Sequence, residues 1–178
     1  MNTEGFERIR PLRVGVLLAL LSIGFGFGLG GVFGLFESEI ERHLESEGRV
    51  VLESTYGGDE AAMKKVTSKS WIYFKRAHLH GGAIGTAALA LCMLLAFLER
   101  SSSAVRGGVS AALGLGAFGY PIFWMLAALR APGLGGTGAA KETLGWLAIP
   151  SSGLVIAGLL AVLVLFATEA FASREDVS

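Results

Sequence analysis

The sequence predicts an all-α integral membrane protein, a bundle of four transmembrane helices with a polar, partly helical connection between the first two. Three observations predict this fold class. Of the 178 residues, 52 % are apolar and only 17 % are charged. The charges are gathered in a few blocks, whereas a soluble domain spreads charge along its sequence. Four apolar stretches are long enough to cross a hydrocarbon core of about 30 Å. We expect residues 1–178 to form a single membrane domain.

The first expected span covers about residues 14–36 and contains no charged residue. At about 1.5 Å per residue it reaches roughly 34 Å. Arg8, Arg10 and Arg13 precede it, as basic residues precede the apolar core of a signal peptide. However, the apolar stretch is too long for such a core, and no small-x-small cleavage site follows before Glu37. We therefore expect a helix that is retained in the protein.

Most of the 26 glycines lie inside the apolar stretches. Small residues there let neighbouring helices approach closely, and many of these glycines are spaced as small-xxx-small pairs. The expected helix-packing residues are Gly24, Gly28, Gly30, Gly34, Gly81, Gly82 and Gly85. Packing within the chain is the favoured interpretation, and a close contact between subunits is the alternative.

The connection at residues 37–70 carries more acidic than basic residues. Ile40 and Leu44 are four residues apart, which predicts that the first helix continues out of the membrane as an amphipathic extension. The glycines at 57–58 should break the chain, and Asp59 is expected to cap the next helix. We expect a solvated segment at the membrane surface, with an acidic docking face as the alternative.

Three further spans are expected at about residues 71–98, 109–129 and 148–168. Trp71 and Tyr73 suit a membrane interface, where an amphipathic ring sits half in water. The Tyr120-Pro121 pair in the third span should kink or locally open its helix, because proline lacks a backbone N–H. The carbonyl freed in this way must then be satisfied by a neighbouring group.

The orientation of the spans is predicted from their flanking cations. An even number of spans places both termini on one side of the membrane. Five arginines favour a cytoplasmic location for that side: Arg8, Arg10, Arg13, Arg100 and Arg106. Five cations near the second span oppose it: Lys64, Lys65, Lys69, Lys75 and Arg76. We expect cytoplasmic termini.

The chain's most informative polar feature is the pair His78 and His80, near the start of the second span. Neutral imidazole is the commonest protein ligand for transition metals, and it also binds haem iron. Residues two apart on a helix point about 200° from each other, so both cannot bind one metal unless the helix unwinds. His78 shares its face with the small residues Gly81 and Gly85, which favours a porphyrin or a close helix contact. His80 lies nearer Arg76, which favours a hydrogen bond, water or an anionic headgroup.

Three interpretations of the two histidines stay open. Each can simply hydrogen-bond a carbonyl or serine of a neighbouring helix. Either can bind a cofactor, with haem b the leading candidate, or take part in metal, quinone or proton chemistry. Candidate second ligands are His43, Met63, Met93, Met125 and the same histidine of a second copy. The chain has no CxxCH motif, which excludes the usual covalent c-type attachment.

The stretch FKRAHLHGGAIGTAALAL, residues 74–91, resembles the His-x-His helix of small bacterial four-helix membrane proteins. More distantly, it is similar to the haem-ligating second helix of haem-copper oxidase subunit I and nitric oxide reductase relatives. The resemblance implies a bacterial inner membrane and a haem ligand at His78 or His80. The chain lacks the further helices and histidines of the larger family, so the resemblance implies a haem-binding or accessory role and no oxidase activity.

No catalytic residue is predicted. The glycines lie in membrane spans without a Walker lysine-serine pair, and no charged residue lies at mid-depth of a span. Zero net charge gives no indication of a nucleic-acid partner. The expected function is that of a structural or accessory subunit of a membrane complex or homo-oligomer. Its partners would be the lipid bilayer and other membrane subunits or further copies. The alternative is a small haem- or metal-binding redox protein that uses His78 or His80.

Overall fold

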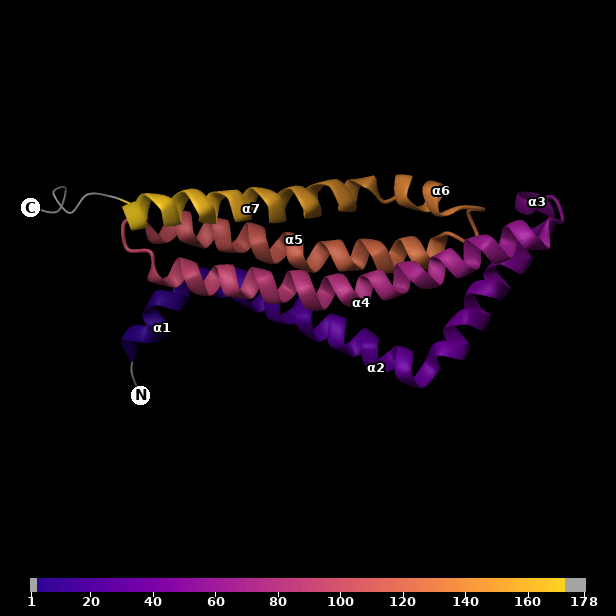
Figure 1. The fold of residues 1–178 in the computed structure, drawn as a ribbon, viewed down its shortest axis with the longest axis horizontal. Coiled ribbons are helices and arrows are strands. Elements are labelled where there is room, and N and C mark those ends of the chain that lie inside the picture. Colours follow the sequence, from indigo (N-terminus) through magenta and orange to yellow (C-terminus); the bar gives the residue numbers. More distant parts are fainter. Residues whose placement is uncertain (1–2, 172–178) are drawn as a thin grey trace, which may run out of the picture.

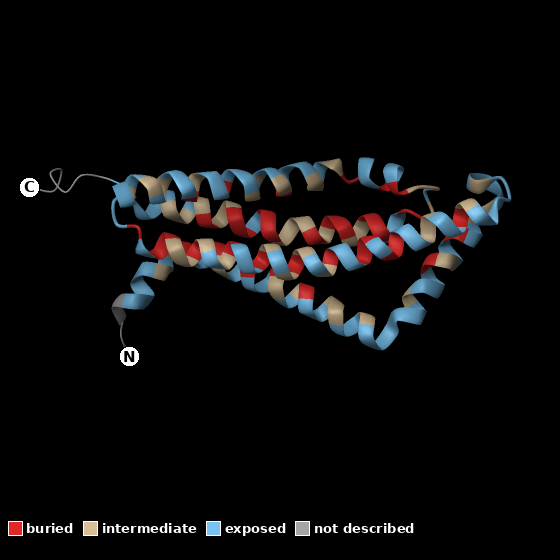
Figure 2. Cartoon of the chain, viewed as in Figure 1, coloured by how far each residue is buried: buried red, intermediate tan, exposed pale blue. Residues whose placement is uncertain are grey.

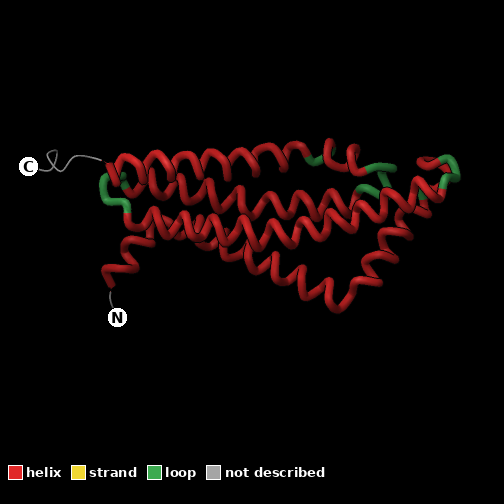
Figure 3. Tube along the Cα trace, viewed as in Figure 1, coloured by secondary structure: helices red, strands yellow, loops and turns green. Residues whose placement is uncertain are grey.

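The computed structural model describes residues 3–171, and every regular element within them is a helix. Four helices are long and apolar enough to cross a membrane: α2 (Arg13–Val50), α4 (Glu60–Phe97), α5 (Ser103–Arg130) and α7 (Gly145–Phe171). The short elements are α1 (Thr3–Ile9), the 3₁₀ turn η1 (Arg10–Leu12), α3 (Leu52–Tyr56) and α6 (Thr137–Glu142) (Figure 3). The prediction of an all-helical chain with four span-length helices is confirmed.

Three of the long helices form the packed centre. α2, α4 and α5 each contact the other two, whereas α7 lies along α5 and barely touches α4 (Figure 1). Buried residues accordingly gather between α4 and α5, and most of the α7 surface is exposed (Figure 2). The bundle is therefore a group of three mutually packed helices with α7 attached to one of them.

Ser22 of α2 joins the three central helices. Its Oγ lies 2.8 Å from the carbonyl oxygen of Ala117 in α5 and 3.1 Å from that of Gly81 in α4, and the serine is fully buried. Pro121 follows Ala117 by four residues, so the Ala117 carbonyl has no helical N–H donor. The hydroxyl of Ser22 supplies the missing hydrogen bond, as expected for a carbonyl freed by this proline. α5 itself runs through Pro121 without a break.

A second buried serine joins the same region nearer the chain termini. Ser110 of α5 donates to the carbonyl oxygen of Leu12, 3.0 Å away, and lies 3.2 Å from the sulfur of Cys92 in α4. Small residues permit this approach, because a Cβ placed on Gly114 would lie 2.7 Å from the Cα of Gly15. Polar side chains thus fix the relative positions of α2, α4 and α5 at two levels.

The connection between the first two spans is a helical hairpin. α2 continues through the acidic segment to Val50, with non-helical dihedral angles at Phe36 (φ −133°, ψ 25°). Figure 1 shows α2 leaving α4, bending and then returning to meet it again. α4 begins at Glu60, where the carboxylate of Asp59 accepts from the N–H of Ala62 at 2.9 Å. The predicted helix extension and N-cap are both confirmed.

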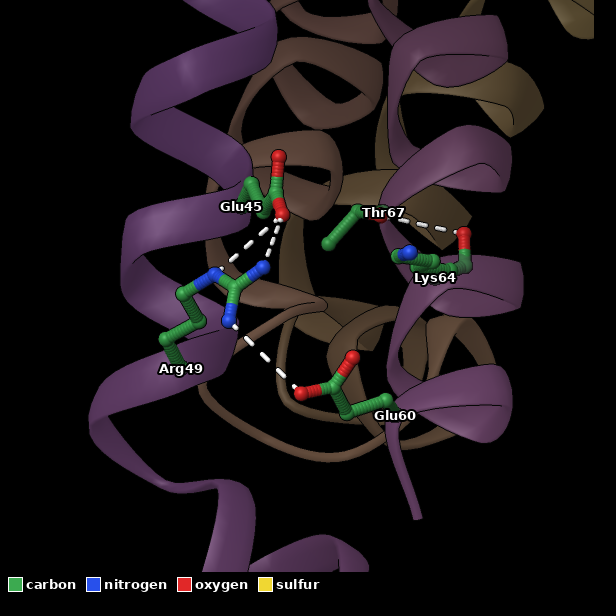
Figure 4. Close-up of polar contacts among 5 residues, drawn as sticks. All are labelled: Glu45, Arg49, Glu60, Lys64 and Thr67. Atoms are coloured by element: carbon green, nitrogen blue, oxygen red, sulfur yellow. Dashed lines mark hydrogen bonds and ion pairs between the residues drawn. The ribbon is translucent and has the colours of Figure 1, made fainter.

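Ion pairs and a tyrosine hold the hairpin in place. Arg49 of α2 lies 2.6 Å from the carboxylate of Glu45 and 3.8 Å from that of Glu60 in α4 (Figure 4). These bonds raise the pKa of Arg49, chiefly through Glu45. The hydroxyl of Tyr56 donates to the carbonyl oxygen of Pro132 at 2.7 Å, and burial raises the pKa of Tyr56. The hairpin tip is therefore fastened to the turn after α5.

At the opposite end, one carboxylate near the end of α7 closes the turn between α4 and α5. Glu169 accepts hydrogen bonds from the backbone N–H groups of Glu99, 3.2 Å away, and Arg100, 2.9 Å away. The side chain of Glu99 in turn pairs with Arg8 at 2.9 Å. This network links α1, the α4–α5 turn and α7.

We predict that Ser22→Ala lowers the thermal stability of the protein in detergent. The substitution leaves the buried Ala117 carbonyl without a donor, and interhelical hydrogen bonds of this kind stabilise membrane proteins by about 1 kcal/mol. The measurement is the unfolding midpoint followed by circular dichroism.

The matched control for this prediction is Ser152→Ala, because Ser152 bonds only to carbonyls of its own helix. In a Pro121→Ala background the backbone N–H at position 121 is restored, so Ser22→Ala should then destabilise the protein less. Equal losses for Ser22→Ala in both backgrounds would contradict the assignment of Ser22 to the carbonyl freed by proline.

Candidate functional site

His78 lies in the contact between α4 and α2. Its Nδ1 is 2.6 Å from the carbonyl oxygen of Gly26, and its ring stands edge-on to Phe33 with the centroids 5.9 Å apart. A Cβ placed on Gly30 would lie 2.7 Å from Cε1 of the imidazole. Because a carbonyl only accepts, Nδ1 carries the proton, and in the neutral ring Nε2 is left with a lone pair. The ring is thus packed directly on the α2 backbone.

His80 lies on the other side of α4 and faces α5. Its Nδ1 is 2.8 Å from the carbonyl oxygen of Arg76, one turn earlier in the same helix. Its ring centroid is 5.2 Å from that of Tyr120 and 6.0 Å from that of Trp124. As for His78, Nδ1 donates to the backbone and Nε2 of the neutral ring is an acceptor.

The two histidines are therefore held by different neighbours, His78 by α2 and His80 by α5. Within the part of the chain that the structure describes, no group of three His, Cys, Asp or Glu side chains is arranged to hold a metal ion. The helix is regular through both positions. The two imidazoles of one chain are therefore not placed to bind the same metal ion.

The expected second ligands do not meet His78. Met63 and Met93 lie on the same helix, each fifteen residues from His78, which corresponds to roughly 22 Å along the axis. Met63 packs instead against Gly48 in the hairpin, and Met125 packs against the aromatic cluster between α4 and α5. His43 is exposed on the hairpin. The ring of His78 packs instead against Gly30 and Phe33 of α2.

Arg76 forms the charged part of an aromatic cluster between α4 and α5. Its guanidinium lies over the ring of Tyr73, 5.3 Å from the centroid, and over the ring of Trp124, 4.9 Å from the centroid. The two rings meet edge to face with centroids 4.8 Å apart. Trp124 is 9 % exposed, and its Nε1 has no acceptor among the described residues. Arg76 and Tyr73 stand out in the sequence beside the histidines, whereas Trp124 does not, because it is far from them in the chain.

One set of the expected packing glycines faces inward. Besides Gly30, a Cβ on Gly81 would lie 2.9 Å from the Cα of Gly26, and a Cβ on Gly85 would lie 3.0 Å from the backbone nitrogen of Ile23. These positions bring the backbones of α2 and α4 together. The Gly82 nitrogen also lies beside Gly26, although the Cβ direction of Gly82 itself is open.

Another set faces outward. Gly24, Gly28, Gly31 and Gly34 are exposed, and a Cβ at any of them would meet nothing within 4 Å. Gly24, Gly28 and Gly31 lie on the side of α2 opposite Ser22 and Gly26, whereas Gly34 follows Gly30 by one turn and lies closer to the side of Gly30. We call the surface of Gly24, Gly28 and Gly31 the outer glycine face of α2. It makes no contribution to packing within the described chain.

The hairpin encloses a small polar cavity of about 250 Å³ between α2 and α4. Its walls include Glu41 of α2. They also include Glu45 of α2 and Lys64 and Thr67 of α4, which are drawn in Figure 4. The volume lies below the about 300–1,000 Å³ of pockets that hold drug-sized ligands. Neither histidine lines this cavity.

Comparisons with protein-family models, with curated proteins and with solved structures each found no match to this chain.

We predict that Gly30→Ala destabilises the protein and that Gly28→Ala does not. The new methyl group at position 30 would overlap the His78 ring, and overpacking of this kind typically costs about 1–3 kcal/mol. At position 28 the methyl group meets open space. Thermal unfolding of both variants in the same detergent tests the difference, and equal midpoints would show that His78 does not pack on Gly30.

Proposed function

We propose that the chain is an integral membrane protein that functions by assembly, as an accessory subunit of a larger membrane complex or as a homo-oligomer. The proposed contact is the outer glycine face of α2. The supporting observation is the separation of the α2 glycines into an inward set that packs on α4 and an outward set that packs on nothing. We further propose the bacterial inner membrane as the location, with the termini in the cytoplasm.

The outward glycines are hard to explain in a lone subunit. A glycine in a helix is about 1 kcal/mol less favourable than alanine, and on a lipid-facing surface it packs no better. Glycines four residues apart, such as Gly24 and Gly28, do form a flat surface on which a second helix can approach closely. A partner helix on this surface gives the outer glycine face a role that packing within the chain does not.

The hairpin supports the same proposal. α2 is held within the span by Ser22, which bonds to Ala117 of α5, and in the hairpin by Arg49, which pairs with Glu60 of α4. An exposed helix fixed in this way presents its outer face in one orientation. A preorganised surface loses less conformational freedom when a partner binds.

The second candidate function is cofactor binding through His80. Its Nδ1 donates to a backbone carbonyl, which is the usual arrangement of a metal-binding histidine, and its Nε2 is an acceptor. The side chain is only half-buried. His78 is half-buried as well, but its bond to Gly26 is partly buried, whereas the bond of His80 to Arg76 is exposed. His80 is therefore the candidate ligand for a haem or metal held between two copies.

We predict that Gly28→Leu disrupts assembly while leaving insertion and folding intact. The leucine side chain would prevent the close approach of a second helix without meeting any atom of its own chain. Cross-linking in membranes, followed by native electrophoresis in mild detergent, measures the assembled fraction. Substitution at a close helix contact should reduce that fraction at least about tenfold.

The matched control for assembly is Gly153→Leu, because Gly153 is an exposed glycine of α7 that also has open space around its Cβ direction. It should leave the assembled fraction unchanged. If Gly28→Leu and Gly153→Leu behave alike, the outer glycine face of α2 is not the contact.

The two candidate functions differ in the absorption spectrum of the protein purified in mild detergent. Assembly without a cofactor predicts no Soret band and comigration with stoichiometric partners or copies. The cofactor alternative predicts a Soret band that His80→Ala removes and His78→Ala keeps, provided that both variants show unchanged circular dichroism.

A further inference from the structure

Arg76 is a cation that the described chain leaves without a counter-charge. No acidic side chain among the described residues lies within ion-pair distance of it. Its guanidinium is held in the corner between the rings of Tyr73 and Trp124. Cation–π contacts orient a guanidinium but leave its edge N–H groups free to donate. The side chain is exposed and therefore accessible from outside the bundle.

Arg76 lies close to the start of the expected second span. It lies five residues inside Trp71, where the apolar stretch of α4 begins, which corresponds to roughly 8 Å. The guanidinium reaches back over Tyr73, three residues closer to that boundary. A long basic side chain that turns toward the interface keeps its charge at the level of the lipid headgroups.

The charge of α4 near this boundary has one sign. Between Glu60 and Glu99 the helix carries five cations and no acidic residue: Lys64, Lys65, Lys69, Lys75 and Arg76. The ammonium of Lys75 also lies over an aromatic ring, 5.6 Å from the centroid of Trp71. Glu41 and Glu45 of α2 line the same cavity as Lys64, whereas Lys75 and Arg76 have no ion pair in the described chain. These two cations favour a ligand with net negative charge over one that carries its own ammonium group.

We propose that Arg76, held on the rings of Tyr73 and Trp124, binds the phosphodiester of an anionic phospholipid in the leaflet beside the hairpin. The guanidinium presents paired N–H donors that match two phosphate oxygens, a geometry that lysine does not reproduce. His80 has its Nδ1 proton on the backbone and donates nothing to the phosphate when its ring is neutral. The inference rests on the proposed membrane location and is independent of assembly through α2.

The test is lipid retention by the full chain, measured by native mass spectrometry after exchange into mixed micelles of phosphatidylglycerol and phosphatidylcholine. The wild type should retain phosphatidylglycerol preferentially. Arg76→Gln should reduce that retention about tenfold, and Arg76→Lys about threefold, because lysine keeps the charge but loses the paired donors. Arg76→Lys also preserves a testable variant should Arg76→Gln fail to fold.

The matched control is Lys69→Gln, which removes a cation of the same helix that lies on no aromatic ring in the described structure. It should retain phosphatidylglycerol within about twofold of the wild type. Equal retention of both lipids by the wild type would overturn the proposal. So would displacement of the bound lipid by millimolar inorganic phosphate, which would indicate a free anion as the ligand. Loss of assembly in Arg76→Gln without a change in lipid retention would assign Arg76 to a protein partner instead.

Discussion

The packing of the three central helices depends on satisfying one backbone carbonyl. Pro121 leaves the Ala117 oxygen without a helical donor, and an unsatisfied carbonyl in an apolar surrounding is costly. The hydroxyl of Ser22 reaches it only because α2 lies close to both α4 and α5. That approach in turn requires glycine at the contacts, as at Gly81. Pro121, Ser22 and Gly81 therefore depend on one another, and each would be unfavourable for the stability of the bundle without the other two.

The same contact also determines which face of α2 stays exposed on the outside of the bundle. Residues two apart on a helix point in nearly opposite directions, so they cannot contact the same neighbouring helix. Once Ser22, Gly26 and Gly30 face the bundle, Gly24 and Gly28 must face away from it. α7 does not cover them, because it is attached to α5 on the far side (Figure 1). The availability of the outer glycine face thus follows from the way the inner contact is made.

Much of the fold could be predicted because it follows from local rules. Uncharged length predicts the spans, the side chain of Asp59 predicts the start of α4, and Pro121 predicts a carbonyl in need of a donor. The bend at Phe36 could not be predicted, since neither glycine nor proline stands at that position. Beyond the bend, α2 returns to α4, and Arg49 there lies 3.8 Å from Glu60. The glycine spacing likewise shows which residues share a face, but only the packed bundle decides which face meets α4.

In the candidate site, the helices that neighbour the two histidines could not be predicted from the sequence. Helical geometry predicts that His78 and His80 diverge, and in the structure one meets α2 and the other meets α5. The contact between Arg76 and Trp124 could not be predicted at all, because the two residues lie 48 positions apart in the chain. Such a cluster has no periodic signal in a single sequence. It is specified by the antiparallel register of α4 and α5, which the buried serines set.

The two ends of the bundle are stabilised in different ways, and this difference connects the fold to its surroundings. At the end that carries the chain termini, two acidic side chains are paired within the chain, as Glu169 is with the α4–α5 turn and Glu99 is with Arg8. At the hairpin end, Lys75 and Arg76 lie on aromatic rings and have no acidic partner in the described chain. The hairpin also has ion pairs of its own, such as Arg49 with Glu45. Lys75 and Arg76 are therefore the charges at this end that the described chain orients without pairing, and they are the ones available to the phospholipid proposed above.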